Sequence, residues 1–217
     1  MREALRGSGP RRRTVLAATL TALATAAGCS TEEPARPPAQ GPEGAADKDA
    51  LVMVIRHGEK PYAGDTGEDG DGKQSPGFLA GRGRRRAQAL PRLFTPTRSA
   101  LLPRPAAVFA AGGAAAPARC RQTVAPLAAA LHTRVRAEFA VGAEAALAGA
   151  VLAAPMPVLV CWEHQGVPRL IRSLGAHRVL GVPAVWPDRY DLVWLFTRSR
   201  GRWSFRELPQ HLLAGDA

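Results

Sequence analysis

The sequence predicts an α/β domain: a three-layer α/β/α sandwich in which helices cover both faces of a mostly parallel β-sheet. Short, continuously apolar runs recur after residue 50, and such runs are typical of strands that are buried on both faces. Between these runs lie longer segments with the apolar spacing of helices. Strands that alternate with helices form parallel or mixed sheets, so the order of the elements indicates the fold class.

The predicted strands and helices follow one another in a regular order. Strands are expected at 51–55, 106–110, 157–162 and 191–197, with a weaker final strand at 203–205 and a possible edge strand at 134–137. Helices are expected at 83–94, 119–132, 143–154 and 167–174. Pro91 and Pro126 fall inside two of these helices and are expected to kink or split them, because proline lacks the amide hydrogen that a helix interior needs.

The first 28 residues resemble a signal peptide for export. Three arginines at 11–13 precede an apolar run at 14–27 that is too short to span a membrane but fits the core of a signal peptide. The small residues at 26–28 lead into Cys29 in a pattern that resembles a bacterial lipobox, so Cys29 is the expected site of lipidation. The alternative is a plain cleaved signal with an incidental cysteine, in which case the protein is secreted.

Residues 29–50 are expected to form a disordered tether. This segment is acidic and rich in Pro, Gly and Ala, a composition that cannot bury a core. The folded domain is then expected to span 51–211. This organisation predicts a protein on the extracytoplasmic face of the cell membrane, attached to the membrane through a lipid anchor at Cys29.

The formal net charge of +11 first suggests a partner that carries phosphate. Excess arginine is common in proteins that bind nucleic acids. The predicted signal contributes +4 of this charge, however, and its removal leaves +7. The run Arg84–Arg86 is interpreted as a solvated helix face, and no series of aromatic residues accompanies it. A nucleic-acid partner is therefore not expected.

Histidines and arginines follow three of the predicted strands. The first strand ends in Arg56 and His57, the helix after the second strand opens with Arg119, and His164 follows the strand at 157–162. Ligands of an open α/β sheet bind beyond the carboxyl ends of its strands, so these side chains are expected to meet at one edge. Arginine offers a planar fork of hydrogen-bond donors, which suits a phosphoryl group.

These motifs resemble those of the histidine phosphatase superfamily, which has the phosphoglycerate-mutase-like fold. The segment 56–59, Arg-His-Gly-Glu, is similar to the opening motif of that family, and the following Lys60-Pro61 is similar to an exported bacterial RHGEKP-type subgroup. The segment 119–123 resembles the second-arginine motif, and the strand before His164 resembles the one that delivers the second histidine. The resemblance covers residues 51–206.

The resemblance implies a phosphohydrolase that cleaves a small phosphomonoester through a phosphohistidine on His57. Arg56, Arg119 and His164 would bind the phosphoryl group and complete the catalytic set. Neither a cofactor nor a metal ion is implied, because side chains supply the positive charge. A non-catalytic exported lipoprotein that binds phosphorylated ligands in the same pocket is the alternative. A mutase is less expected, since export would remove it from intracellular metabolites.

The proton donor for the leaving group is not settled by the sequence. In related sequences the second histidine is followed by Asp or by Gly-Glu, whereas here it is followed by Gln165-Gly166. The candidates are Glu59, Glu138, Glu163 and an aspartate of the loop at 65–71. Loss of a general acid costs about 10²- to 10⁴-fold in rate, so this departure motivates the non-catalytic alternative.

Two further features have no settled role in the sequence. The segment 61–77 is rich in Gly and Asp without periodicity, and it is expected to be a mobile loop over an active site. Cys161 lies in a predicted buried strand and is expected to be a small core residue. Whether it pairs with Cys120 is left open, as are the substrate and the oligomeric state.

Overall fold

The computed structural model describes residues 48–69, 71–94, 102–113 and 116–216. Their elements are β1 (Ala50–Arg56), α1 (Gly81–Ala89), the 3-10 helix η1 (Leu90–Leu93), β2 (Ala107–Ala110), α2 (Arg119–Ala130), β3 (Val135–Arg136), α3 (Glu144–Ala153), β4 (Val158–Trp162), α4 (Val167–Ser173), β5 (Leu192–Ser199) and β6 (Arg202–Pro209). The predicted signal, Cys29 and nearly all of the predicted tether lie outside the described residues. None of the helices within these ranges is long and apolar enough to cross a membrane.

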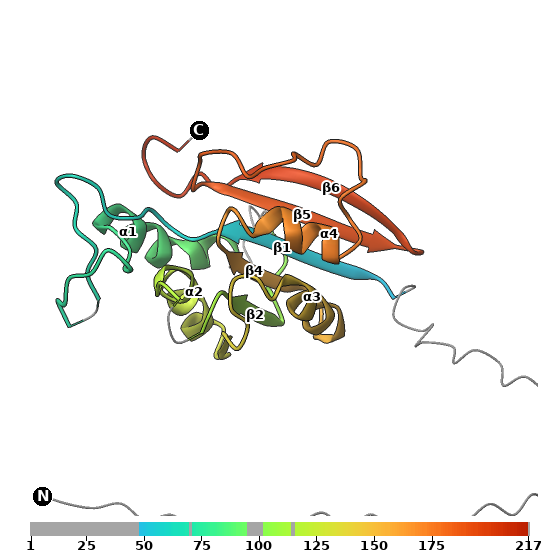
Figure 1. Ribbon diagram of the computed structural model, residues 1–217, viewed down its shortest axis with the longest axis horizontal. Helices are drawn as coiled ribbons and strands as arrows, with labels where there is room; N and C mark the ends of the chain where they lie inside the picture. The colour runs from blue at the N-terminus through green and yellow to red at the C-terminus, as the bar shows by residue number, and fades with distance from the viewer. Residues whose placement is uncertain (1–47, 70, 95–101, 114–115, 217) are drawn as a thin grey trace, which may run out of the picture. The chain divides into compact units, whose positions relative to one another are not determined.

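One six-stranded sheet runs through the domain in the order β3-β2-β4-β1-β5-β6 (Figure 1). The strands β3, β2, β4 and β1 are parallel neighbours, whereas β5 and β6 pair in antiparallel fashion. Every residue of β2 and β4 is buried, as their continuous apolar runs predict. The structure therefore confirms the predicted α/β sandwich with a mostly parallel sheet.

The helices form two packed pairs, α1 with α2 and α3 with α4 (Figure 1). The chain crosses the sheet in one direction from β1 through β2 to β3, and it returns in the other direction through β4 to β5. Crossovers between parallel strands are right-handed, so the change of direction places α1 and α2 on one face and α3 on the other. Since α4 packs beside α3, both faces are covered.

The final strand is longer than the sequence predicts. The expected weak strand at 203–205 is wrong in extent, because β6 pairs with β5 from Ser199↔Arg202 to Leu192↔Pro209. The sequence underestimates this strand because its side chains alternate between exposed and partly buried over much of its length. Alternation gives a weaker apolar signal than the continuous run of a strand buried on both faces.

The two prolines within predicted helices act differently. The helix expected at 83–94 is an α-helix only to Ala89 and continues as the 3-10 helix η1, which contains Pro91. Proline has no amide hydrogen to donate and its ring crowds the preceding turn, which explains the change of helix type. Pro126 lies inside α2 without ending it, so the expected split does not occur there.

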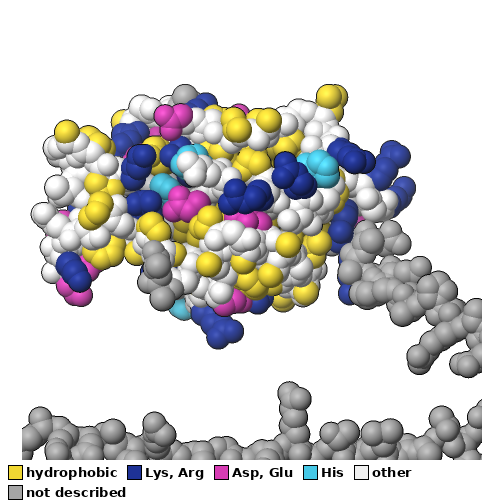
Figure 2. Space-filling model, viewed as in Figure 1, with side chains coloured by type: hydrophobic (Ala, Val, Ile, Leu, Met, Phe, Trp, Pro, Cys, Tyr) yellow, Lys and Arg dark blue, Asp and Glu magenta, His cyan; other side chains and the backbone are white. Residues whose placement is uncertain are grey.

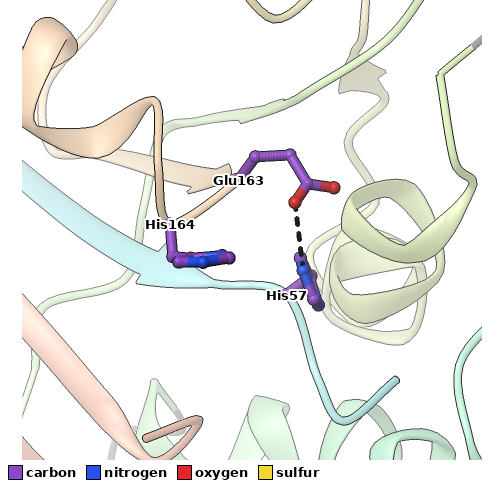
Figure 3. A group of neighbouring side chains, drawn as sticks. All are labelled: His57, Glu163 and His164. Carbon is purple, nitrogen blue, oxygen red and sulfur yellow. Dashed lines mark ion pairs between the residues drawn. The ribbon is translucent and has the colours of Figure 1, made fainter. Parts of the chain in front are cut away.

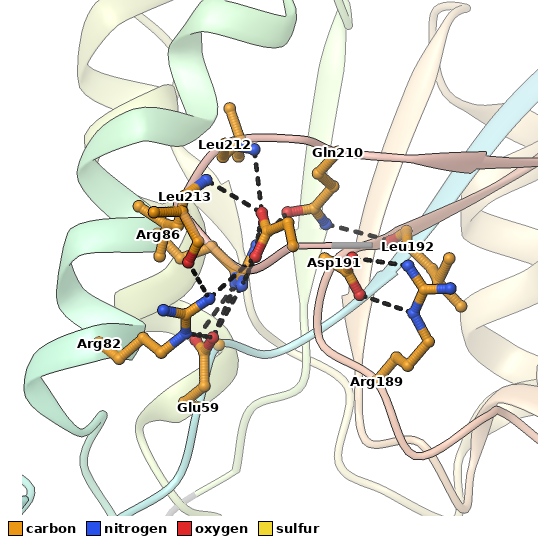
Figure 4. A network of polar contacts seen from close by, with 12 residues as sticks. Glu59, Arg82, Arg86, Arg189, Asp191, Leu192, Gln210, Leu212 and Leu213 are labelled. Carbon is orange, nitrogen blue, oxygen red and sulfur yellow. Dashed lines mark hydrogen bonds and ion pairs between the residues drawn. The ribbon is translucent and has the colours of Figure 1, made fainter.

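A buried ionic network joins the end of the described chain to α1 (Figure 4). The side chain of Arg86 is 3% exposed, and its Nη2 lies 2.8 Å from Glu59 and 2.7 Å from Asp216. The prediction of a solvated face for Arg84–Arg86 is therefore wrong for Arg86. The cause is position, since this residue lies on the side of α1 that meets the loop after β1. The contacts of the domain extend beyond the predicted boundary at 211 to Asp216.

Asp216 is expected to make stability depend on pH. Burial alone would raise the pKa of Asp216, but hydrogen bonds from Arg86 and from backbone N–H groups hold it at about 2. A pKa depressed in the folded state stabilises the protein above about pH 4, and this contribution is lost as the pH falls towards 2. We expect Asp216→Asn to lower the free energy of unfolding by about 2 kcal/mol at neutral pH and to reduce its decline below pH 4.

Urea unfolding measured from neutral to acidic pH tests this expectation. The matched control is Asp71→Asn, which changes an exposed aspartate. An Asp216→Asn protein whose stability falls with pH as steeply as that of the unchanged protein would contradict the assignment.

Candidate functional site

The candidate site lies at the carboxyl ends of β1 and β4, which are neighbours in the sheet. Their parallel register runs up to the pair Arg56↔Trp162, so the next residues, His57 and Glu163, leave the sheet side by side. After β1 the chain continues to β2, which lies on one side of this pair of strands. After β4 it continues to β5, which lies on the other side. Such a reversal opens a crevice between two strand ends, where α/β proteins bind their ligands.

His57 is buried, and its ring is held in one tautomer. Its Nδ1 lies 2.7 Å from the carbonyl oxygen of Gly58. A carbonyl oxygen only accepts hydrogen bonds, so Nδ1 carries a proton and Nε2 is the atom that can present a lone pair. Nε2 is the nitrogen that faces Glu163.

The loop after His57 is fixed by both helices on its side of the sheet. The backbone N–H of Gly58 donates to Oγ1 of Thr123 at 2.8 Å, and that hydroxyl donates to the carbonyl of Arg119 at 2.8 Å. Helix α1 approaches the loop through Gly83, where an added Cβ would lie 2.6 Å from the carbonyl oxygen of Glu59. A side chain at this position of α1 would displace the loop, which explains the glycine.

Two arginines contribute buried donor atoms to the site. The guanidinium of Arg56 lies 4.1 Å from the ring centre of Tyr190, and its Nη1 donates to Asp188 at 3.2 Å. Arg119 is the first residue of α2, and its Nη1 donates to the carbonyl of Pro76 at 2.7 Å. The Nε atoms of both arginines are buried without a hydrogen-bond partner in the described part of the chain. Buried donors are almost always paired in folded proteins, so these two atoms indicate a place for a bound acceptor.

Glu163 and His164 follow β4 and reach towards His57 (Figure 3). Oε2 of Glu163 lies 3.2 Å from Nε2 of His57, and its Oε1 lies 3.7 Å from Nη2 of Arg119. Nδ1 of His164 is another buried atom without a partner among the described residues. The structure thus brings together all four predicted site residues, Arg56, His57, Arg119 and His164, and adds Glu163.

The positive charges within the site lower the pKa of both Glu163 and His164. Burial would raise the pKa of Glu163, but the hydrogen bond with His57 and the charges of His57, Arg119 and His164 hold it below its usual value. Burial and the positive charges of Arg56 and His57 lower the pKa of His164. At neutral pH His164 is therefore an uncharged imidazole, which can donate one hydrogen bond.

The same side chains could in principle hold a metal ion. The ligand atoms of His57, Glu163 and His164 lie within 4.8 Å of one another, and they form the one such group found in the described ranges. The guanidinium groups of Arg56 and Arg119 beside them repel a divalent cation and attract an anion. The electrostatics therefore favour a phosphoryl group, and the absence of a metal stays a prediction.

The other candidate proton donors are bonded elsewhere or exposed; of the loop aspartates, Asp69 accepts the backbone N–H groups of residues 71 and 73, and Asp71 is exposed. Glu59 is bound to two arginines of α1. Asp65 accepts the backbone N–H groups of residues 81 and 82, at 2.6 Å and 3.2 Å, at the start of α1. The side chain of Glu138 is 47% exposed and pairs with an arginine of β3. Among these candidates, Glu163 is the one that the structure places against His57.

Tyr190 and Asp188 are site residues that the sequence analysis misses. They belong to the segment between α4 and β5, which has no apolar pattern or motif. The ring of Tyr190 lies 6.0 Å from that of His57 and also covers Arg56, so it forms one wall of the site. The only signal available in the sequence is the position of Tyr190 just before β5, the other neighbour of β1.

The loop at 61–77 borders the site through the hydrogen bond between Arg119 and Pro76. Backbone hydrogen bonds from Ser75 to Gly67 and from Glu68 to Leu79 tie the loop together. Its position beside the site agrees with the sequence-based expectation, while its mobility stays a prediction.

The two cysteines beside the site are buried free thiols. Cys161 is fully enclosed in β4, as expected of a core residue. Burial raises the pKa of the Cys161 thiol, and the neighbouring thiol of Cys120 raises it further. The Cys161 thiol is therefore neutral at physiological pH.

Comparisons with protein-family models and with curated proteins find no match for this chain. Similar solved structures include a mycobacterial glucosyl-3-phosphoglycerate phosphatase in complex with VO3 (TM-score 0.47, 13% identity, 73% of this chain and 97% of that one). Others are a SixA protein from Nakamurella multipartitia (TM-score 0.46, 18% identity, 77% and 98%) and a phosphoglycerate mutase from Bacillus anthracis str. Sterne (TM-score 0.41, 11% identity, 76% and 94%). At these identities the likeness says nothing about which reaction this chain catalyses.

Proposed function

We propose that this protein is a phosphohydrolase that cleaves a small phosphomonoester through a phosphohistidine on His57. The observation that carries the proposal is a set of buried side-chain nitrogens that have no hydrogen-bond partner among the described residues and that belong to the same strand ends and helix start as His57. These atoms are Nε of Arg56, Nε of Arg119 and Nδ1 of His164. Two permanent cations and a neutral imidazole beside the nucleophilic His57 match a phosphoryl group, which carries its charge on three equatorial oxygens.

The reaction follows from this arrangement in two steps. In the first, the lone pair of Nε2 attacks phosphorus, the N–P bond forms, and the bond between phosphorus and the leaving-group oxygen breaks. The hydrogen bond from Nδ1 to Gly58 stabilises the ring as it becomes positively charged. In the second step, water attacks phosphorus, the N–P bond breaks, and inorganic phosphate is released.

The face of the molecule in Figure 2 supports a small substrate rather than a nucleic acid. On this face the basic side chains are interspersed with acidic and apolar ones. Nucleic-acid-binding surfaces instead gather their basic residues on one face or along one helix. We further propose, from the N-terminal sequence, that the enzyme acts outside the cell membrane and is lipid-anchored at Cys29.

The test of the proposed function is to trap the intermediate on the full chain. We expect the protein to hydrolyse 4-nitrophenyl phosphate, and rapid acid-free quenching after exposure to ³²P-labelled phenyl phosphate should leave a label on the protein. A phosphohistidine is stable in alkali and is lost in acid. No turnover together with no label would overturn the proposal, and a label that survives acid would assign the nucleophile to another type of residue.

A further inference from the structure

The contact between Glu163 and His57 cannot form without a proton between its two atoms. Nδ1 of His57 already donates to Gly58, so in the uncharged ring Nε2 is an acceptor. Both oxygens of an ionised carboxylate are acceptors too, and Oε2 of Glu163 lies 3.2 Å from Nε2. Two acceptors do not approach in this way, so the pair holds one proton, which either atom can carry.

The proton has to reside on Glu163 when the substrate reacts. A protonated Nε2 has no lone pair and cannot attack phosphorus. The leaving-group oxygen, in contrast, needs a proton as its bond to phosphorus breaks. A single transfer from Nε2 to Glu163 therefore frees the nucleophile and produces the acid at the same time.

From this geometry, and on the basis of the proposed phosphohydrolase activity, we infer that Glu163 is a catalytic residue that donates the proton to the leaving group. In the first step the carboxyl proton passes to the leaving-group oxygen while the N–P bond forms and the P–O bond breaks. In the second step the Glu163 carboxylate accepts a proton from the attacking water while the N–P bond breaks. The pair then again holds one proton, so protons and electrons balance over the cycle.

The groups that surround Glu163 explain why a phosphorylated ligand would move the proton. The charged groups that act on it are His57 after β1, Arg119 of α2 and His164 after β4, and its own charge acts on the thiol of Cys161. Arg56 and Lys60 act on the neighbouring His164. With the pocket empty, the cations of this set favour a charged carboxylate. When a phosphoryl dianion binds, it pairs with Arg56 and Arg119 and offsets their positive charge. Its own negative charge then favours the protonated form of Glu163.

The test uses two substrates that differ in their need for an acid. Glycerol 2-phosphate releases an alkoxide and depends on a proton donor, whereas 2,4-dinitrophenyl phosphate releases a stable phenolate and does not. We expect Glu163→Gln to lower kcat/KM for glycerol 2-phosphate by about 10²- to 10⁴-fold and to change phosphoenzyme formation from dinitrophenyl phosphate by less than about threefold. Glu163→Asp keeps a carboxyl group and should recover part of the loss.

Glu138→Gln is the matched control. It makes the same change at an exposed carboxylate that the sequence also offers as a candidate proton donor. It should leave both substrates unaffected. If Glu163→Gln, or Glu163→Asp should the former not fold, slows both substrates equally, the role of Glu163 is structural and the inference is wrong. If the unchanged protein forms no acid-labile phosphoenzyme from either substrate, the proposed function itself fails.

The pH profile gives a second and independent readout. Two groups that share a proton titrate as a pair, so the activity of the unchanged protein on glycerol 2-phosphate should fall at high pH as the pair loses its last proton. In Glu163→Gln this basic limb should disappear, because glutamine carries no proton to lose. If activity declines at high pH in the same way in both proteins, the decline belongs to another titrating group, and the inference is wrong.

Discussion

Replacing His57 with alanine is expected to abolish turnover of every phosphomonoester, with a loss of about 10⁴- to 10⁶-fold. In the proposed reaction the ring supplies the lone pair that forms the N–P bond, and the hydrogen bond to Gly58 and the contact with Glu163 hold the ring in place. With the nucleophile absent, the remaining arginines can still bind phosphate. The variant should therefore bind inorganic phosphate, yet it should carry no ³²P label after exposure to labelled phenyl phosphate.

The control for this variant is His177→Ala, which removes an exposed histidine outside the site. It should keep both turnover and label. Circular dichroism and thermal unfolding would establish that His57→Ala is folded, since the change leaves Arg119 as the remaining ion-pair partner of Glu163. A His57→Ala protein that is folded and still acquires an acid-labile label would contradict the assignment of the nucleophile.

Replacing Arg86 with methionine is expected to destabilise the domain by about 3–5 kcal/mol. Arg86 is buried between Glu59 and Asp216, whose side chains are 9% and 2% exposed. Removal of the cation leaves two buried carboxylates that Arg82 alone must balance. The free energy of unfolding of such a domain is about 5–15 kcal/mol, so this loss is a large fraction of the total stability.

Thermal and urea unfolding of Arg86→Met and of Arg85→Met measure this effect. Arg85 is the preceding residue of the same helix and is exposed, so its replacement should change the stability by less than about 0.5 kcal/mol. If both replacements change the free energy of unfolding equally, the buried network adds no stability beyond that of an exposed arginine on the same helix, and the prediction is wrong.

The sequence predicts the parallel part of the sheet well because those strands are buried on both faces. Their apolar runs have no polar interruption, and the motifs at their ends mark where the chain leaves the sheet. The site residues Arg56, His57 and His164 are predictable for the same reason, since each lies within two residues of the end of such a run. Arg119 is found from its place at the start of the helix after β2.

The remaining contacts depend on register and on tertiary packing, which spacing along the chain does not determine. Glu163 is one of several equivalent candidates until the pairing Arg56↔Trp162 places it beside His57. Arg86 belongs to a run of three arginines, and its burial depends on a partner 130 residues further along the chain. Tyr190 lies in an irregular segment whose path is set only by the strands that it connects.

The parallel register of β1 and β4 also determines which parts of this molecule can change in length. Side chains of a strand alternate between the two faces, so an insertion of one residue near the end of either strand would turn the following residues to the other side and separate His57 from Glu163. The loop at 61–77 is not part of that ladder, and loops accept extra residues at low cost. An insertion in this loop would therefore leave the contact between His57 and Glu163 unchanged, whereas an insertion at either strand end would break it.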